Sequence, residues 1–350
     1  MLEPNIQLDH KCILVTGAAG FIGANLIQQL LRDYPHCRIV GLDNLNNYYD
    51  VSLKHHRLAQ IEALAGEERW IFRRGDIADK DALEALFGQF RFQVVVNLAA
   101  QAGVRYSIDH PDAYMASNVM GFYNILECCR RYPVEHLVYA SSSSVYGANQ
   151  KVPYSVDDPV DHPVSLYAAT KKTNELMAHT YAKLYGIPTT GLRFFTVYGP
   201  AGRPDMAYFS FTDKLIRGDT IEIFNYGNCK RDFTYVDDIV RGVMLVMARA
   251  PMEAVPYRIY NIGNSSPENL LDFVDILQQE LVSAGVLPET YDFESHKRLV
   301  PMQPGDVVAT YADVSELVRD TGFQPRTDLR RGLRSFARWY KAFYTSGKEA

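Results

Sequence analysis

The sequence predicts an α/β fold with a doubly wound parallel sheet and a second, smaller α/β domain at the C-terminal end. Three observations lead to this fold class. Short apolar runs alternate with helical stretches through the first 198 residues, which is the pattern of strands and crossover helices in a parallel sheet. A glycine-rich turn follows the first apolar run, and an aspartate ends the second. Right-handed crossovers then place helices on both faces of the sheet.

Each expected strand is a short run rich in Val, Ile, Leu or aromatic residues, as buried parallel strands require. In chain order, the strands are expected at residues 12–15, 38–42, 70–72, 94–96, 136–140 and 189–195. The helices that connect them are expected at residues 21–32, 53–65, 81–87, 112–131 and 166–185. Every strand but the last is therefore followed by a helix before the next strand begins.

The pattern changes after residue 198. Glycine and proline crowd residues 199–204, and the regular alternation weakens beyond them. We therefore expect a first domain over residues 1–198 and a second domain mainly over residues 199–350. A helix at 236–248 and a strand at 257–262 are expected to return to the first sheet, so that roughly 236–262 joins the first domain. Further helices are expected at residues 270–284, 314–321 and 329–344.

Composition and charge favour a small-molecule partner. The 350 residues are 47% hydrophobic and 22% charged, with a net charge of −5, as in ordinary globular proteins. The sequence has no long Lys/Arg run of the kind that binds nucleic acid or a membrane surface. No apolar run reaches the roughly 18 residues of a membrane span, and the first ten residues lack a signal-peptide core. The five cysteines match no metal motif, which indicates free thiols in the cytoplasm and no metal site.

The glycine turn is the first candidate site. Gly17, Gly20 and Gly23 lie between the first strand and the first helix. Glycines let the backbone approach a pyrophosphate, and the helix N-terminus supplies amide donors. Asp43 ends the second strand, where a carboxylate can accept hydrogen bonds from a ribose 2′-hydroxyl and would repel a 2′-phosphate. The alternative is a tight structural turn, but the spacing and context predict NAD binding.

Two later strands also end in residues suited to that ligand. Asp76 and Ile77 follow the third strand, and Leu98, Ala99 and Ala100 follow the fourth. Ligands bind along the carboxyl edge of such sheets, and the small alanine side chains let a flat cofactor lie close.

Tyr167 and Lys171 are the candidate chemical centre. Residues four apart share one helical face, so the phenol and the ammonium can face one place. A free phenol has a pKa near ~10, and a neighbouring cation lowers it, which makes the pair a plausible general base. Four serines, residues 141–144, end the fifth strand and can hydrogen-bond a hydroxyl or carbonyl of a substrate. A chance Tyr/Lys pair and a serine-rich loop are the alternatives.

Taken together, these motifs resemble an extended short-chain dehydrogenase/reductase over nearly the whole chain. They include the glycine turn, Asp43, Asn97-x-Ala-Ala, Ser-Ser-Ser-Ser-Val-Tyr-Gly at 141–147, the Tyr–Lys pair and Leu-Arg-Phe-Phe-x-Val-Tyr-Gly-Pro at 192–200. Within that family the chain most resembles nucleotide-sugar 4-epimerases, specifically UDP-glucuronate 4-epimerases. This narrower resemblance lies in the segments 42–49, 102–107, 202–207 and 302–307.

The resemblance implies a catalytic cycle that leaves the cofactor unchanged. Tyr167 takes the O4 proton of the sugar while C4 is oxidised by tightly bound NAD. Lys171 lowers the pKa of Tyr167 and holds the nicotinamide ribose, and Ser142 hydrogen-bonds O4. The 4-keto sugar rotates and is reduced on its other face. The implied NAD-binding residues are Gly17, Gly20, Phe21, Ile22, Gly23, Asp43, Asn44, Asn47, Asp76, Ile77, Leu98, Ala99, Ala100, Gln101, Asn118, Tyr167, Lys171 and Phe194.

Residues beside Ser142 bear on the fate of the 4-keto sugar. Related 4,6-dehydratases carry Asp-Glu before Val-Tyr-Gly, and uronate decarboxylases typically carry Glu there, whereas this chain has Ser143 and Ser144. Oxidising C4 of glucuronate gives a β-keto acid, which loses carbon dioxide unless its carboxylate is restrained. Ser143, Ser144, Thr196 and Arg203 are the candidates for that grip, and Arg offers a fork suited to a carboxylate.

The resemblance also assigns the nucleotide end of the substrate. Arg231 is expected at the UDP phosphates and Asp306 near the uridine ribose. Gln303 stands where galactose-type epimerases have an arginine, and Arg105 is the candidate replacement cation. A homodimer is expected. Three alternatives stay open: a 4-epimerase of UDP-glucose or UDP-N-acetylhexosamines, a UDP-glucuronate decarboxylase, and a non-catalytic NAD-binding protein on the same fold.

Overall fold

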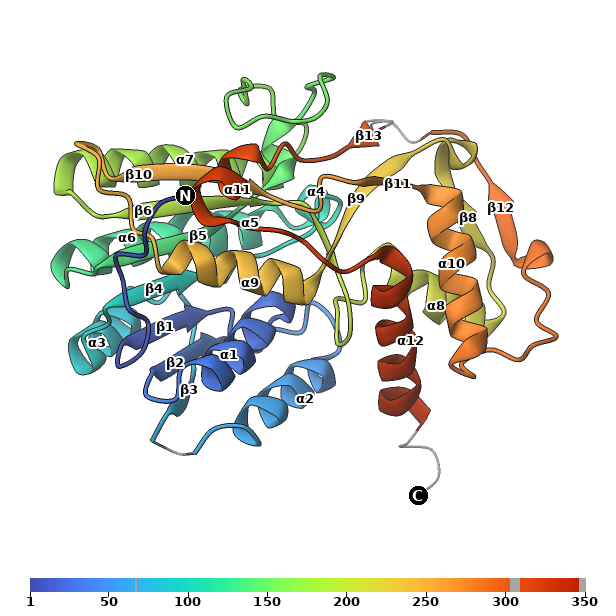
Figure 1. Ribbon diagram of the computed structural model, residues 1–350, viewed down its shortest axis with the longest axis horizontal. Coiled ribbons are helices and arrows are strands. Elements are labelled where there is room, and N and C mark those ends of the chain that lie inside the picture. Colours follow the sequence, from blue (N-terminus) through green and yellow to red (C-terminus); the bar gives the residue numbers. More distant parts are fainter. Residues whose placement is uncertain (67, 303–308, 346–350) are drawn as a thin grey trace.

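A computed structural model describes residues 1–66, 68–302 and 309–345 (Figure 1). Its centre is a seven-stranded sheet in the order β10-β6-β5-β4-β1-β2-β3, with every neighbouring pair parallel. The strands are β1 Cys12–Thr16, β2 Arg38–Asp43, β3 Trp70–Arg74, β4 Val94–Asn97, β5 His136–Ser142, β6 Thr189–Phe194 and β10 Tyr257–Ile262. The predicted doubly wound sheet is confirmed, and the strand at 257–262 does return to it beside β6.

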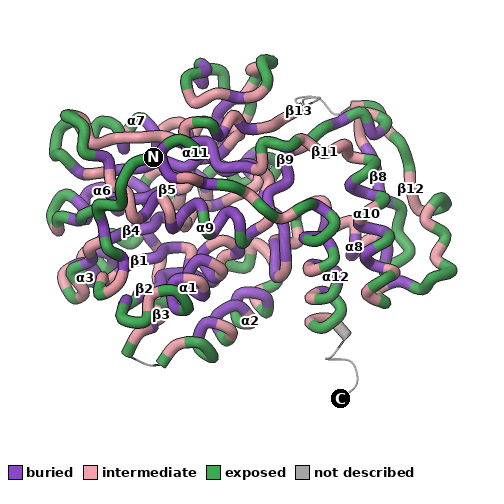
Figure 2. The backbone as a smooth tube through the Cα atoms, viewed as in Figure 1, coloured by how far each residue is buried: buried purple, intermediate pink, exposed green. Residues whose placement is uncertain are grey.

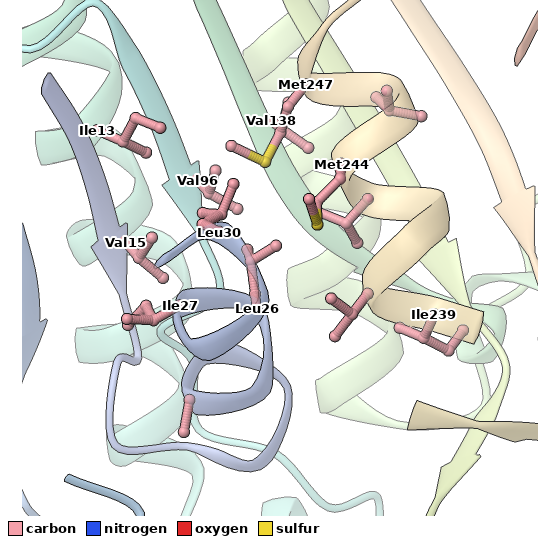
Figure 3. Close-up of a cluster of buried hydrophobic side chains, with 14 of the residues drawn as sticks. Ile13, Val15, Leu26, Ile27, Leu30, Val96, Val138, Ile239, Met244 and Met247 are labelled. Atoms are coloured by element: carbon pink, nitrogen blue, oxygen red, sulfur yellow. The ribbon is translucent and has the colours of Figure 1, made fainter. Parts of the chain in front are cut away.

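Helices cover both faces of this sheet, as the right-handed crossover rule requires. One layer holds α1 Phe21–Asp33, α2 Val51–Glu62 and α9 Val236–Met247, and the other holds α3 Lys80–Phe90, α6 Phe122–Arg131 and α7 Leu166–Tyr185. Figure 3 shows the first layer: Leu26 and Leu30 of α1 and Met244 of α9 lie against Val96 and Val138 of the sheet. Figure 2 shows the strands buried and the outer helix faces exposed.

The helix expected at 112–131 is not a regular α-helix. It consists of α5 Pro111–Tyr114, a π-helical segment η1 Met115–Gly121, and α6. A π segment carries one extra residue per turn, and such segments often lie beside functional sites. Here the segment contains Asn118, which is 2% exposed and points its amide toward the backbone of Gln101.

The C-terminal part forms a smaller cluster beside the carboxyl edge of the sheet (Figure 1). Helices α8 Ala207–Arg217, α10 Leu270–Ser283 and α12 Leu329–Thr345 enclose a core that includes Phe209 and Phe273. Its strands are β7 Thr196–Tyr198, β8 Ile221–Ile223, β9 Lys230–Tyr235, β11 Pro267–Asn269, β12 Lys297–Leu299 and β13 Ala309–Thr310. Sheet pairing joins β7, β11 and β13 to β9, and β12 to β8.

The remaining elements are short. They are α4 Tyr106–Asp109, α11 Ser315–Thr321 and the 3₁₀ turns η2 Ser143–Tyr146, η3 Phe224–Gly227 and η4 Glu294–His296. Although α11 comes late in the chain, its Leu317 packs into the core of the first sheet. In the described part of the chain, no helix is both long and apolar enough to cross a membrane.

Candidate active site

A cavity of about 500 Å³ lies at the carboxyl edge of the parallel sheet, where the strand order reverses between β1 and β4. Ligands of doubly wound folds bind at such a switch point. The cavity brings together most of the residues that the sequence singled out. These are Gly17, Gly20, Phe21, Ile22, Gly23, Asp43, Asn44, Asp76, Ile77, Leu98, Ala99, Ala100, Gln101, Ser142, Ser143, Ser144, Tyr167, Lys171, Phe194, Thr196 and Arg203.

At the glycine turn, neighbouring backbone segments lie so close together that a Cβ would not fit. Gly17 has a φ of +67°, and a Cβ placed there would lie 2.9 Å from the amide nitrogen of Ala99. A Cβ at Gly23 would lie 2.2 Å from the carbonyl oxygen of Gly17. Helix α1 then begins after Gly20, which supplies no side-chain cap. Its first amides are therefore available to a pyrophosphate in the cavity.

Asp43 is held rigidly at the end of β2. Its two carboxylate oxygens accept hydrogen bonds from the amides of Ala19 (3.1 Å) and Leu45 (2.9 Å). The ammonium of Lys54 lies 3.7 Å from the carboxylate, and both side chains are buried. Burial lowers the pKa of Lys54, and the charge of Asp43 opposes that shift. Sequence reasoning missed Lys54, because nothing in its helical context distinguishes it from a surface lysine.

Side-chain amides connect the chain that follows β3 and β4 to its surroundings. Asn44 donates a hydrogen bond of 2.8 Å to Asp76. Asn118 lies behind the cavity wall rather than in it: it exchanges hydrogen bonds of 2.8 and 3.0 Å with the backbone of Gln101 and donates to Thr170 at 3.1 Å. Asn118 thus ties the β4 edge to α7, the helix that carries Tyr167. Asn47 is exposed and lies outside the cavity lining.

Helix α7 begins at the predicted residue. Ser165 caps it by accepting a hydrogen bond of 3.1 Å from the amide of Ala168, so that Tyr167 and Lys171 lie in its first turns. The Lys171 ammonium donates to the carbonyl oxygen of Ala140 at 2.8 Å and lies 6.0 Å from the centre of the Tyr167 ring. Helix α7 is thereby fixed against β5, which ends at Ser142.

The electrostatic surroundings of this pair are mixed. Burial raises the pKa of Tyr167, while a hydrogen bond with Ser142 and the charge of Arg203 lower it. Burial also lowers the pKa of Lys171, to about 8. Ser142 itself is oriented by the chain that follows, because its hydroxyl accepts a hydrogen bond of 3.1 Å from the amide of Ser144. Ser142 and Tyr167 therefore interact directly, and Lys171 lies beside them at the end of β5.

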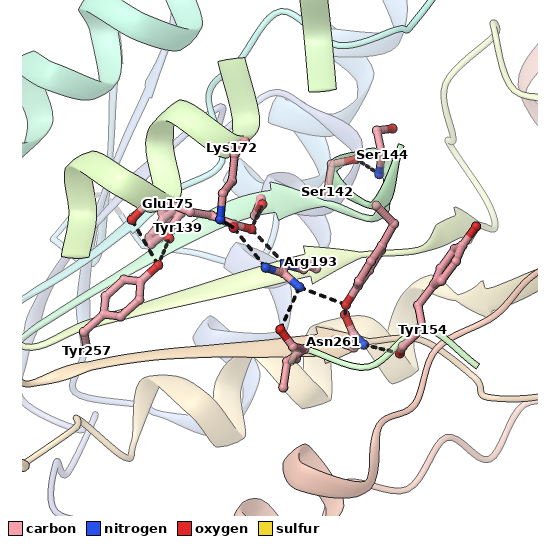
Figure 4. A network of polar contacts seen from close by, with 12 residues as sticks. Tyr139, Ser142, Ser144, Tyr154, Lys172, Glu175, Arg193, Tyr257 and Asn261 are labelled. Atoms are coloured by element: carbon pink, nitrogen blue, oxygen red, sulfur yellow. Dashed lines mark hydrogen bonds and ion pairs between the residues drawn. The ribbon is translucent and has the colours of Figure 1, made fainter. Parts of the chain in front are cut away.

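A buried ion pair between Arg193 and Glu175 lies next to this centre (Figure 4). Arg193 of β6 donates two hydrogen bonds, of 2.9 and 3.0 Å, to Glu175 of α7, and both side chains are at most 3% exposed. Ser141, next to Ser142, donates to the same carboxylate at 2.7 Å. Arg193 also donates to the hydroxyl of Tyr146 at 3.0 Å. The network joins α7, β5 and β6 directly beneath the serine turn.

Arg203 faces the same cavity from the loop that precedes α8. Its guanidinium is held by Asp205 in a two-point contact of 3.0 and 2.5 Å. The hydroxyl of Tyr48 donates to Asp205 at 3.3 Å, so this contact bridges the β2–α2 loop and the loop before α8. Tyr48 and Asp205 both line the cavity. Both lie in segments that carry the resemblance noted above, but their contact across the cavity could not be read from the sequence.

The residues expected at the nucleotide end are not brought into this cavity. Arg105 is exposed, with its guanidinium carbon 5.9 Å from the centre of the Phe224 ring. Arg231 lies in β9 and donates to the carbonyl oxygen of Lys230 at 3.0 Å. Neither arginine lines the cavity. The two further candidates, Gln303 and Asp306, lie outside the described residues.

The fold and the cavity define the class of protein. A doubly wound sheet with a glycine turn, an aspartate at the end of β2 and a Ser–Tyr–Lys centre is the arrangement of an extended short-chain dehydrogenase/reductase. The chain belongs to the NAD dependent epimerase/dehydratase family, whose sequence model matches residues 13–263.

Individual relatives are similar over almost the entire chain. Protein CapI of Staphylococcus aureus is 47% identical over 346 residues, which cover 95% of this chain and 99% of that protein. UDP-glucuronate 4-epimerase 4 of Arabidopsis thaliana is 45% identical over 352 residues, covering 97% of this chain and 77% of that protein. The crystal structure of UDP-glucuronic acid 4-epimerase from Bacillus cereus, in complex with UDP-glucuronic acid and NAD, is similar with a TM-score of 0.82 at 32% identity, covering 95% and 100% of the two chains.

Proposed function

We propose that this protein is an NAD-dependent UDP-glucuronate 4-epimerase, which interconverts UDP-glucuronate and UDP-galacturonate. One observation carries the proposal. A single cavity combines the glycine turn and the Ser142–Tyr167–Lys171 centre with an arginine, Arg203, and with serines at positions 143 and 144. Relatives named as UDP-glucuronate 4-epimerases at about 45% identity support the same substrate.

The residues of the cavity fit NAD. The turn at Gly17–Gly23 leaves no room for a Cβ at Gly17 or Gly23, and α1 presents unsatisfied amides beside it. These are the features that hold a pyrophosphate. Asp43 would hold the adenosine ribose, and Lys171 the nicotinamide ribose. Bound NAD supplies a hydride acceptor and donor at C4 of the sugar, and the protein supplies orientation and proton transfer.

Tyr167 would act as the general base and acid. In the forward half of the cycle its phenolate takes the O4 proton as C4 becomes a carbonyl carbon, and in the reverse half the phenol returns that proton to O4. Ser142 would hydrogen-bond O4 and, through its effect on the pKa of Tyr167, stabilise the phenolate. The buried ammonium of Lys171 lies on the same face of α7 and completes the centre.

Whether the 4-keto intermediate is epimerised or decarboxylated depends on how its carboxylate is held. A 4-keto uronate loses carbon dioxide when its C5–C6 bond aligns with the carbonyl π system. Arg203 can bind a carboxylate with two parallel hydrogen bonds, and Ser143, Ser144 and Thr196 line the same cavity. We assign these four residues to the C6 carboxylate, where they would hold the C5–C6 bond out of alignment.

The proposal extends to the roles of the two domains and to the residues that would bind the UDP part of the substrate. Residues 1–198 with about 236–262 would bind NAD, and residues 199–350 would mainly bind the UDP-sugar. We assign Arg231 to the diphosphate, with Arg105 as a second cation, and we assign Gln303 and Asp306 to the substrate, with Asp306 at the uridine ribose.

We also propose that the protein is a cytoplasmic homodimer. Apolar side chains are exposed on the outer face of α7 and the adjoining π-helical segment, including Leu176 (58% exposed), Leu184 (65%) and Met120 (51%). A second copy of this surface would cover them. All five cysteines are free thiols, which supports a reducing compartment.

Product analysis tests the function. The purified protein is incubated with UDP-glucuronate, UDP-glucose and UDP-N-acetylglucosamine without added NAD, and the products are resolved by NMR. UDP-galacturonate should be the main product, and the glucuronate should react fastest. Faster turnover of UDP-glucose or UDP-N-acetylglucosamine would favour the alternative epimerases. A UDP-pentose would reject the proposal in favour of a decarboxylase.

A further inference from the structure

Arg57 is a buried arginine that connects two segments bordering the candidate site. It lies on α2 and is 1% exposed. Its Nη1 donates to the carbonyl oxygen of Ala19 at 2.9 Å and to the hydroxyl of Tyr49 at 2.7 Å. Its Nε and Nη2 donate to the carbonyl oxygen of Ala201 at 2.9 and 2.7 Å, and Nη2 also reaches Gly202 at 3.0 Å. One guanidinium thus joins residue 19 to residues 201–202, which are far apart in the sequence.

The first of these segments is the glycine turn. Ala19 lies between Gly17 and Gly20, and its amide donates to Asp43 at 3.1 Å. The amide of Ala19 is thus held by the residue assigned to the adenosine ribose, while its carbonyl is held by Arg57. The turn is fixed on two sides.

The second segment leads directly into the carboxylate grip. Ala201 has a φ of +51°, which is a left-handed conformation that costs a residue with a Cβ about 1 kcal/mol or more. The two hydrogen bonds from Arg57 to its carbonyl oxygen stabilise that conformation. Two residues later the chain presents Arg203, which lines the same cavity as Tyr167. A shift of the backbone at 201–202 would move Arg203 with it.

The chemistry of these contacts requires an arginine. Among the described residues, Arg57 forms no ion pair with a carboxylate; its partners are three backbone carbonyls and one hydroxyl. A planar fork with several fixed donors can reach acceptors on opposite sides, whereas a lysine ammonium places its donors at a single point. Lysine at this position would keep the charge and lose the bridge.

We propose that Arg57 is a positioning residue for substrate specificity: it clamps the loop 201–202 to the glycine turn and so holds Arg203 where it meets the C6 carboxylate of the sugar. This inference rests on the proposed function, because it takes Arg203 to be the carboxylate ligand. Asp205 and Tyr48 orient the guanidinium of Arg203 itself, whereas Arg57 sets the backbone from which that side chain extends.

Equilibrium binding tests this proposal without turnover. All proteins carry Tyr167→Phe so that the bound sugar is not converted, and calorimetry with saturating NAD gives the Kd of UDP-glucuronate and of UDP-glucose. Arg57→Lys should raise the Kd of UDP-glucuronate about tenfold or more, since charge-assisted contacts of Arg203 are lost. The Kd of UDP-glucose should change less than about twofold, because that sugar has no carboxylate.

Arg69→Lys is the matched control. Arg69 also donates to two backbone carbonyls, those of Leu31 and Tyr34, but away from the cavity. The Arg69→Lys variant should leave both Kd values unchanged. If Arg57→Lys does not fold, Tyr49→Phe removes one acceptor of Arg57 and should shift the ratio of the two Kd values in the same direction by a smaller factor.

The outcomes separate this inference from the proposed function. Wild-type protein that does not convert UDP-glucuronate would overturn the proposed function. Wild-type protein that does convert it, together with an Arg57→Lys variant that weakens both sugars equally or neither, would overturn the role of Arg57 alone. Equal weakening would identify a residue that only maintains the fold.

Discussion

The ammonium of Lys171 donates a hydrogen bond of 2.8 Å to the carbonyl oxygen of Ala140. This contact joins the first turns of α7 to the last residues of β5, so that Tyr167 and Ser142 approach the cavity from two elements that cannot move independently. It also leaves a charged side chain buried at 4% exposure. Because burial disfavours the charged form, the affinity of Lys171 for its proton is lowered.

Lys171 should make stability rise with pH above neutrality. Its pKa is about 8 in the folded protein, against an ordinary value of 10.5, because burial disfavours the charged form. Below pH 8 the lysine is charged in both states and the full cost of burial applies. Between about pH 8 and 10.5 the unfolded chain binds more protons, so the free energy of unfolding rises with pH, by up to about 3 kcal/mol.

Urea unfolding of wild-type protein and of Lys171→Met at pH 7.5 and pH 9.5 measures this effect. Other groups also titrate in this range, so the quantity of interest is the difference between the two proteins. Wild type should gain stability relative to the variant as the pH rises. A difference that is independent of pH would show that the buried lysine keeps its ordinary pKa.

Ser142 should control the pH at which the enzyme becomes active. Burial raises the pKa of Tyr167, and the hydrogen bond with Ser142 lowers it. Removing that hydrogen bond in Ser142→Ala should raise the pKa of Tyr167, so the rising limb of kcat/KM should move to higher pH. A uniform loss of activity at every pH, with the limb unmoved, would mean that Ser142 contacts only the substrate.

Arg203 should discriminate between glucuronate and glucose. Replacing it with alanine removes hydrogen bonds to a carboxylate, and the expected loss of kcat/KM for UDP-glucuronate is about 100-fold. Activity on UDP-glucose should fall far less. Arg217→Ala on α8, where the side chain is 67% exposed, is the control and should behave as wild type. Equal losses on both sugars would remove Arg203 from the carboxylate grip.

Glu175 should contribute strongly to stability. Its carboxylate pairs with Arg193 in the protein interior, and Glu175→Gln leaves the arginine buried without its counter-charge. Breaking a buried pair in this way costs roughly 3–5 kcal/mol. The exposed pair of Glu222 and Arg298 offers a matched control, and Glu222→Gln should cost less than about 1 kcal/mol. Urea unfolding compares the two, and similar small losses would show that the buried pair is dispensable.

Much of the first sheet could be predicted, because its strands and helices leave strong local patterns. The helix at Leu166–Tyr185 begins and ends at the predicted residues, since Ser165 caps one end and Gly186 ends the other in a left-handed conformation. The glycine turn and Asp43 lie in the cavity because their spacing encodes one local geometry, a strand, a turn and a helix.

The C-terminal part was harder to predict for a physical reason. Helix α8 was not expected at Ala207–Arg217, because its apolar residues follow directly on a glycine- and proline-rich stretch. Strands such as β7 and β11 have only three residues. Such strands form because β9 offers a partner from elsewhere in the chain, and a local pattern cannot show that.

The same limit applies to the missed site residues. Tyr48 and Asp205 meet across 157 positions, and Lys54 is placed beside Asp43 by the packing of α2. Arg57 looks like an ordinary helical arginine in the sequence, since backbone carbonyls hold it and any residue carries those. Contacts of this kind depend on the assembled fold, so only the structure reveals them.

The most direct test of the proposed epimerisation follows one hydrogen atom. UDP-glucuronate carrying deuterium at C4 is incubated with the purified protein in ordinary water without added NAD, and the product is identified by NMR and mass spectrometry. The hydride that leaves C4 should return to C4, so UDP-galacturonate should form with its carboxylate intact and its deuterium still at C4. A UDP-pentose formed with release of carbon dioxide, or UDP-galacturonate that has lost its deuterium, would contradict this function.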